Sequence, residues 1–454
     1  MEPVDSAARL EMPRGSGRLL IRHLRASPHL QRHGFLAILA LIVLGVMLGV
    51  ALSRAAKPVE LGSLAQARGF LATAASAAPV APVLYGSPPG YALVLAGLAA
   101  IDGGTAAGLD CIAATPETCG RRAWPFVVGV QVLIAIATLL LVLALAWRLS
   151  GQAPIALLTL VLVFFASRPG EAASSLRPGI WYLFFLLAFL VLSNESLRRR
   201  STAWTSASGV ALGMAVLFEP YAIVIASVVA IWLLGRGRHG VPMAAGLLIG
   251  TALTATCGLV WAGRHGYDPA SVLSYQTRLL AQRLAFLSLE PGSWIAALVV
   301  PIPLLGDWLA LVLPDAMVRK LGAFGPGTLL MEGANVIQPQ AFAKAAGEPA
   351  GAIAWLLHDR LMANPVAYLA SLPPVLARGL WGGGGIVALI GILHVKGMLG
   401  FARADWRHDE HVLAMLPALT LLAVNTLVTD NSHWLNPLLP ILYAYAFAYV
   451  AAGW

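Results

Sequence analysis

Two adjacent arginines, Arg121 and Arg122, are the residues of this sequence best suited to bind a phosphate group. They stand just before Trp124, where a long apolar run begins. A guanidinium group offers a planar fork of donors that matches the oxygens of a phosphate. The pair therefore suits either the phosphate of a lipid-linked substrate or, less specifically, the headgroups of anionic lipids.

Three acidic residues stand at positions where chemistry or helix structure would need a carboxylate. Glu60 lies at the start of a segment, 59–73, whose apolar spacing predicts a short amphipathic helix at the membrane interface. Its carboxylate either stabilises the helix start or is free for chemistry. Asp102, before Gly103-Gly104, is expected to cap a turn. Glu219-Pro220 interrupts an apolar run, which predicts a functional site at membrane depth or a helix break at the surface.

The three cysteines are too few for a disulfide scaffold. Cys257 lies in an apolar stretch and is interpreted as a packing residue. Cys111 and Cys119 flank a polar turn and are a candidate disulfide if that loop faces an oxidising compartment. No Walker loop, His-Glu-x-x-His motif or dinucleotide fingerprint occurs, so no cofactor is predicted, and the acids of 263–377 show no metal-ligand spacing.

The composition excludes an ordinary water-soluble enzyme. Of 454 residues, 59% are hydrophobic and 11% are charged, whereas soluble domains carry about 25% charged residues. Long unbroken apolar runs also exclude disorder and an outer-membrane barrel. The formal charge of +9 lies in short clusters between these runs, which is typical of membrane topology signals and not of nucleic-acid binding. We therefore expect an all-α polytopic membrane protein.

The basic clusters predict the topology. Residues 1–34 are a basic cytoplasmic segment before a first span at 35–53, which we interpret as a signal anchor, with cleavage after Ser53 as the alternative. The clusters are Arg148, Arg198–Arg200, the pair Arg236 and Arg238, and Lys396 with Arg403 and Arg407, and an even number of runs separates each neighbouring pair. About 10–12 spans with both termini in the cytoplasm, in a bacterial inner membrane, satisfy this pattern. The other apolar runs lie at 124–147, 154–167, 179–194, 205–218, 220–235, 241–262, 378–395, 410–428 and 436–453.

Four regions follow from this topology. After 1–34 comes a transmembrane core, 35–262, with a long outer loop at 54–123, where Pro88-Pro89 opens a juxtamembrane helix. A second outer loop, 263–377, contains a proline-broken apolar stretch at 293–314 that predicts re-entrant or surface helices. The C-terminal spans occupy 378–454. Because long structured loops tend to carry function, chemistry is expected on the outer face.

The order of several motifs resembles the GT-C class of membrane glycosyltransferases, particularly the protein mannosyltransferase and aminoarabinose transferase type. Glu60 falls where that family has an acidic pair, although Val59 takes the place of its first acid. Pro88-Pro89-Gly90-Tyr91 resembles the Pro-Pro segment, and Arg121 or Arg122 the arginine before the second span. The later matches are Leu176-Arg177-Pro178-Gly179, Leu217-Phe218-Glu219-Pro220-Tyr221 and His433-Trp434-Leu435-Asn436-Pro437.

The resemblance implies a GT-C fold and transfer of a sugar from a polyprenyl-phosphate donor to an acceptor on the outer face. Glu60 would act as the general base. The cationic partners of the departing phosphate would be Arg121, Arg122, Lys57 and Arg177, with Tyr91 and His433 as further substrate-binding candidates. A divalent metal held by paired carboxylates is not predicted, because Val59 replaces one acid. The other partners would be membrane lipids, and the acceptor is open.

Two other interpretations stay open. A transporter or lipid-linked saccharide flippase would show internal repeats and broken helices at the midplane, and the chain has no clear duplication. A catalytically silent GT-C-like scaffold would fit the missing first acid. Convergence of the candidate residues on one site would favour the enzyme.

Overall fold

The computed structural model describes residues 57–58, 61–74, 87–114, 124–167, 175–268, 270–300, 305–321, 327–381 and 409–428, with single positions at 45, 396–397, 399 and 442. Chain contacts divide the molecule into Met1–Met47 and Leu48–Trp454. All elements below belong to the second unit.

Seven helices of the described chain coincide with the apolar runs expected from the sequence. They are α7 (Pro125–Ser150), α8 (Ala153–Ser167), α10 (Gly179–Arg199), α11 (Thr202–Phe218), α12 (Ala222–Leu234), α13 (Gly240–Arg264) and α23 (Asp409–Leu427). In the described part, α7, α10, α23 and α13 with its preceding 3₁₀ turn η1 (Gly237–His239) are long and apolar enough to cross a membrane. The chain is thus a helical membrane protein. The expected spans at 35–53 and 436–453, and 378–395 beyond Trp381, lie outside the described helices.

Ion pairs show which helix ends lie together. Arg148 near the end of α7 and Arg198 and Arg199 near the end of α10 all bind the carboxylate of Glu195. Arg236, just after α12, binds Asp409 at the start of α23. We call this side the Glu195 end. The basic clusters at Arg148 and Arg198–Arg200 share it, as an even number of crossings between them requires, while the side of the membrane stays a prediction.

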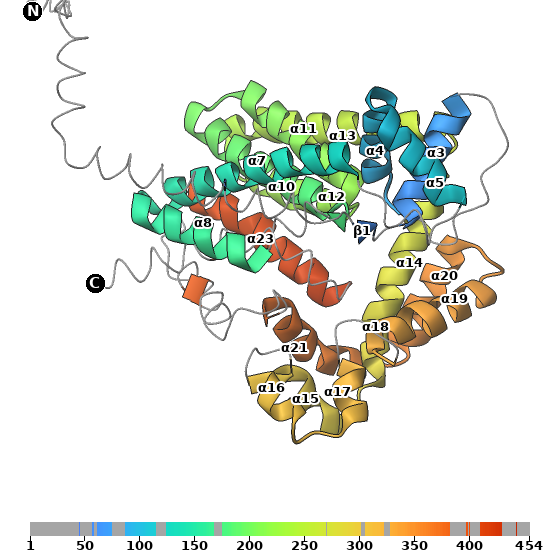
Figure 1. Cartoon of the computed structure of the whole chain (residues 1–454). Helices are drawn as coiled ribbons and strands as arrows, with labels where there is room; N and C mark the ends of the chain where they lie inside the picture. The colour runs from blue at the N-terminus through green and yellow to red at the C-terminus, as the bar shows by residue number, and fades with distance from the viewer. Residues whose placement is uncertain are drawn as a thin grey trace, which may run out of the picture. The chain divides into compact units, whose positions relative to one another are not determined.

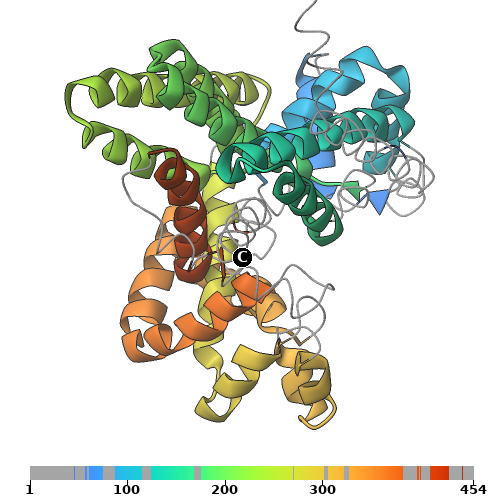
Figure 2. The same cartoon turned by 90° about the vertical axis from the view of Figure 1, so that its left-hand side faces the viewer.

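The helices α11 and α13 pack at very short distance because each carries a Gly-x-x-x-Gly motif, at 209–213 and 246–250. A Cβ on Gly209 would lie 2.4 Å from the carbonyl oxygen of Leu247. A Cβ on Gly250 would lie 2.5 Å from a backbone oxygen of α11. Both views of the fold show the two helices running side by side (Figures 1 and 2).

The segment expected as the first outer loop, which we call the first outer segment, forms three short helices: α3 (Leu61–Ala74), α4 (Pro89–Ile101) and α5 (Gly103–Ala114). The first two were predicted, whereas α5 begins where the sequence led us to expect a turn. They pack on one another, and α4 also packs on α11 and α13. Leu64, Ala67 and Phe70 of α3 are buried, and Phe70 meets Trp261 edge-on at 5.8 Å. The apolar stripe of α3 is therefore covered by protein, although the sequence led us to expect it to lie in the lipid interface.

The second outer segment is a separate helical layer with its own core (Figure 1). The stretch expected to hold a broken pair, 293–314, forms two helices of six residues, α15 (Trp294–Val299) and α16 (Leu305–Ala310), each too short to cross a membrane. The remaining elements are α14 (Ala270–Leu284), η2 (Ala285–Ser288), η3 (Pro291–Ser293), α17 (Asp315–Leu321), α18 (Leu329–Glu332), the π turn η4 (Gly333–Ile337), α19 (Gln338–Lys344), α20 (Pro349–Trp355), the π turn η5 (Leu356–Met362) and α21 (Pro365–Trp381).

Candidate functional site

A two-stranded parallel ladder joins two candidate segments that are far apart in the sequence. The strand β1 (Lys57–Pro58) pairs with β2 (Ser175–Leu176), so that Lys57 lies opposite Ser175 and Pro58 opposite Leu176. Arg177 follows directly and is exposed, and α10 begins at Gly179. The segment leading to Glu60 and the Arg-Pro motif that opens α10 therefore meet at one place.

The Pro-Pro motif packs against the end of α11. Pro89 is the first residue of α4, where the missing N–H of proline costs nothing, and its neighbour Gly90 touches the other helix. A Cβ on Gly90 would lie 2.7 Å from the carbonyl carbon of Leu217. The hydroxyl of Tyr267, after α13, donates to the carbonyl of Ser87 at 3.4 Å. We call this side, where α10 and α12 start and α11 and α13 stop, the Glu219 end.

Glu219 marks a true helix break. Its backbone is extended, its N–H still donates to Ala215, and Pro220 follows. The residue is 9% exposed. The hydroxyl of Tyr275, on α14, lies 3.3 and 3.4 Å from the two carboxylate oxygens. The break thus holds a buried carboxylate between α11, α12 and α14. The expected helix break is confirmed, and a functional role of this acid stays a prediction.

Aromatic side chains surround this carboxylate. Tyr221 is two residues after Glu219, and Tyr182 is the neighbour of Trp181 in α10. Trp181 stacks on Phe218 with ring centroids 6.4 Å apart and planes 2° from parallel. Trp181 and Tyr182 are less than a tenth exposed. We use the name Glu219 cluster for Trp181, Tyr182, Glu219, Tyr221 and Tyr275.

Two buried polar groups of the cluster have no hydrogen-bond partner among the described residues. Within the described residues, the indole N–H of Trp181 and the hydroxyl of Tyr182 are buried and make no hydrogen bond. Burying such a group without a partner costs about 1–3 kcal/mol. A buried polar group of this kind needs a partner from a ligand, water or another part of the chain.

Two further predicted residues can be placed. Tyr91 is fully buried, and its hydroxyl accepts a hydrogen bond from Nε2 of Gln131 at 2.8 Å. That contact fastens α4 to α7, so the structure gives Tyr91 a packing role, and its contact with substrate stays a prediction. Asp102 caps α5 as expected, because its carboxylate accepts from the backbone N–H and the hydroxyl of Thr105 at 2.7 and 2.6 Å. Glu60, Arg121, Arg122, Cys119 and His433 lie outside the described residues.

Of the two cysteines that the structure describes, one is disulfide-bonded and the other is a free thiol. Cys111 is disulfide-bonded, and because Cys119 lies outside the described residues their pairing stays a prediction. Cys257 is a free thiol on the exposed surface of α13. Our interpretation of Cys257 as a packing residue is wrong, because α13 buries only the side that carries its glycine motif.

The surroundings of Asp102 and Tyr267, two groups outside the membrane-spanning helices, shift their pKa values. Hydrogen bonds from Thr105 lower the pKa of Asp102 below its ordinary value. Burial raises the pKa of the Tyr267 phenol to about 12, and the nearby charge of Asp268 acts in the same direction. Tyr267 is therefore a neutral donor at physiological pH. In the described part of the chain, no group of three or more His, Cys, Asp or Glu residues is arranged to hold a metal ion.

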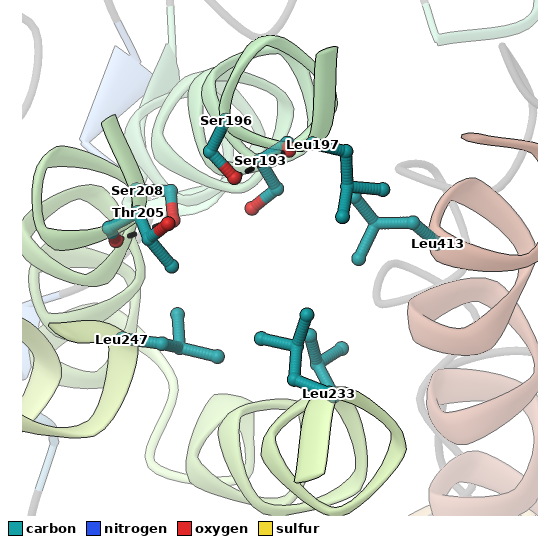
Figure 3. A pocket seen from close by; sticks show the side chains of 9 residues that line it. Ser193, Ser196, Leu197, Thr205, Ser208, Leu233, Leu247 and Leu413 are labelled. Atoms are coloured by element: carbon teal, nitrogen blue, oxygen red, sulfur yellow. Dashed lines mark hydrogen bonds between the residues drawn. The ribbon is translucent and has the colours of Figure 1, made fainter. Parts of the chain in front are cut away.

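A small cavity lies at the other end, among α10, α11, α12, α13 and α23 (Figure 3). Its volume is about 10 Å³, close to the minimum for one water molecule. The hydroxyls of Ser196 and Ser208 donate to backbone carbonyls of their own helices, at 2.8 and 2.7 Å. The cavity is therefore a packing defect with room for a water, and it cannot hold a sugar.

Sequence reasoning missed the ladder and the tyrosines around Glu219. Strands of two residues have no hydrophobic period to detect. Tyr182 and Tyr275 lie within helices and look like ordinary aromatic residues there. The one available signal was the acid beside a proline in an apolar run.

Comparison of this chain with protein families, with curated proteins and with solved structures finds no match.

Proposed function

We propose that this protein is a glycosyltransferase that moves a sugar from a polyprenyl-phosphate donor to an acceptor at the outer face of a bacterial inner membrane. The observation that carries the proposal is the pairing of Lys57–Pro58 with Ser175–Leu176. It brings the segment two residues before Glu60 beside the segment one residue before Arg177. A base and a cation for the leaving group are both required, and their segments meet here.

The reaction is a displacement at the anomeric carbon. The acceptor oxygen forms a bond to that carbon while the bond from carbon to phosphate oxygen breaks, and the phosphate leaves with the electron pair. Glu60 takes the proton of the acceptor hydroxyl, which typically contributes about 10²–10⁴-fold in rate. Arg177, with Lys57, Arg121 and Arg122 as further cations, neutralises the departing phosphate.

Other features support this proposal. Trp124, which follows Arg121 and Arg122, packs on α5, where a Cβ at Gly108 would lie 2.8 Å from its ring. The Pro-Pro motif meets the Leu217–Tyr221 segment through Gly90. The Pro-Pro motif and the Leu217–Tyr221 segment, both singled out by the resemblance, thus meet at the Glu219 end. A transporter would instead need its site at the midplane of paired repeats.

Sugar transfer tests the proposal directly. The purified full chain is incubated with a lipid extract containing radiolabelled polyprenyl-phosphate sugars, and transfer to a hydrophilic or lipid acceptor is counted. We expect Glu60→Gln to lower kcat by about 10²-fold or more, and Arg177→Ala to lower kcat/KM. The control is Glu290→Gln, because Glu290 is an exposed acid of the second outer segment. Equal activity of Glu60→Gln and the control would eliminate Glu60 as the base.

A further inference from the structure

The Glu219 cluster combines hydrogen-bonding groups of opposite kinds. The carboxylate of Glu219 only accepts when ionised, whereas the indole N–H of Trp181 only donates. Tyrosine hydroxyls do both. The indole N–H and the Tyr182 hydroxyl are buried without a partner among the described residues. A ligand that completes this set presents oxygen lone pairs to the indole and the phenol, and its hydroxyl hydrogens can add to the bonds that the acid already accepts.

A polyhydroxylated ring meets these requirements. Each sugar hydroxyl donates one hydrogen bond and accepts others, and the ring oxygen accepts as well. The phosphodiester of a polyprenyl-phosphate sugar has only acceptors, so it cannot donate to an ionised Glu219, and its negative charge would be repelled by the carboxylate. Aromatic faces also suit the apolar C–H face of a sugar, and Trp181 with Phe218 forms a stacked aromatic wall beside the acid.

The position of the cluster agrees with this chemistry. Trp181 and Tyr182 lie on the first turn of α10, a few residues after Arg177, which is exposed. Glu219 follows Leu217, which contacts the Pro-Pro motif through Gly90. The exposed cation Arg177 and the buried Glu219 cluster therefore lie at the same end of the helices. A ligand could place its phosphate against Arg177 and its sugar against the cluster.

We infer that the Glu219 cluster is a binding site for a neutral sugar ring, in which Glu219 accepts from sugar hydroxyls and Trp181 and Tyr182 donate to sugar oxygens. Tyr275 is a positioning residue, because its hydroxyl holds the carboxylate at 3.3 and 3.4 Å. This inference rests on the proposed function and assigns the substrate's sugar, as distinct from its phosphate, to named residues.

Tyr182→Phe is the sharpest variant. The phenol oxygen of Tyr182 has no hydrogen bond within the described part of the chain, so its removal leaves no described donor or acceptor unpaired and the fold should not lose stability. A ligand contact, in contrast, would be lost. We expect about three- to tenfold weaker sugar binding for Tyr182→Phe, and about tenfold or more for Glu219→Gln.

The measurement is ligand-induced stabilisation of the full chain in detergent. Free hexoses and pentoses at about 100 mM are the probes, and inorganic phosphate is the comparison. We expect at least one sugar to raise the Tm of the wild type. Inorganic phosphate at the same ionic strength should change the Tm of the wild type and of Glu219→Gln equally. The matched control is Glu195→Gln, which changes a buried glutamate at the opposite end. Whatever the Tm of this variant without ligand, sugar should raise it as much as in the wild type.

Two results would overturn the inference: no sugar stabilises the wild type, or Tyr182→Phe and Glu219→Gln retain the full sugar effect, in which case water serves the buried groups. The transfer assay separates the two proposals. Transfer with unchanged KM in both variants would reject the sugar site and leave the transferase standing. Sugar stabilisation lost in both variants, with no transfer by the wild type, would reject the transferase and leave the site.

Discussion

Arg283 is fully buried, and its environment allows a quantitative prediction. Its Nε donates to the carbonyl of Thr426, in the last turn of α23, at 2.7 Å, and its Nη1 donates to Ser371 Oγ at 3.0 Å. The guanidinium lies 4.7 Å from the ring centre of Tyr368, whose hydroxyl donates to the carbonyl of Leu427. One side chain therefore joins α14, α21 and α23.

The size of the effect follows from these contacts. Two hydrogen bonds from a charged donor contribute about 1.5–3 kcal/mol each, and a desolvated cation on an aromatic ring about 2 kcal/mol. Removing the buried charge recovers several kcal/mol of desolvation. We therefore expect Arg283→Met to lower the free energy of unfolding by about 2–4 kcal/mol.

Arg283→Lys gives the more informative result. Lysine keeps the desolvation cost of a buried charge, but its compact ammonium cannot reach Thr426 and Ser371 together or lie flat on a ring. We expect lysine to destabilise at least as much as methionine. The assay is thermal or urea unfolding in detergent, followed by tryptophan fluorescence. Arg360→Met is the control, because Arg360 also lies over a ring and donates to a side chain, but at the surface; it should change stability by less than about 0.5 kcal/mol.

The reasoning would be refuted if lysine behaved like the wild type while methionine unfolded the chain. That order would mean that the charge alone matters and that the fork of the guanidinium does not. Wild-type stability of both variants would mean that the three helices are held by apolar packing alone.

Two smaller predictions concern α4 and the cap that follows it. Gly90→Ala should destabilise by about 1–3 kcal/mol, because its Cβ would lie 2.7 Å from backbone atoms of Leu217, whereas Gly97→Ala in the same helix has nothing within 4 Å and should be neutral or stabilising; the Tm of the pair decides, and equal values would contradict the contact. Asp102 has a lowered pKa because Thr105 donates to it, so its stabilising effect is present above the ordinary pKa of about 3.9 and disappears as the pH falls through the lowered value. Asp102→Asn should therefore lower Tm at pH 7 and differ less from the wild type below about pH 4, and a difference that grows with acidity would contradict this sign.

The membrane helices could be predicted because apolar runs and charge clusters are strong local signals. The run at 205–218 became α11 and the run at 220–235 became α12, with the break at Glu219 where proline interrupts the helix ladder. Asp102 likewise acts as the expected cap because capping depends on residues only three positions apart.

The rest depends on contacts that no local pattern encodes. Arg283 lies in a helix of mixed polarity, and its partners are 88 and 143 residues away. The pairing of Lys57 with Ser175 spans a similar separation. Cys257 was misplaced because an apolar helix in a membrane protein buries one side against protein and leaves the other to lipid. The Gly-x-x-x-Gly spacing of Gly246 and Gly250 indicates which side of α13 packs on another helix, whereas Cys257 is exposed.

The close approach of α11 and α13 has a mechanical consequence. With the Cβ of Gly209 replaced by hydrogen, no side chain separates the two backbones at that crossing, and close-packed surfaces of this kind move as one piece. Glu219 is attached directly to the end of α11 and so inherits that immobility. Tyr275 belongs to α14, outside the pair. Loosening the glycine crossing would therefore displace the acid relative to Tyr275, which contacts it from α14.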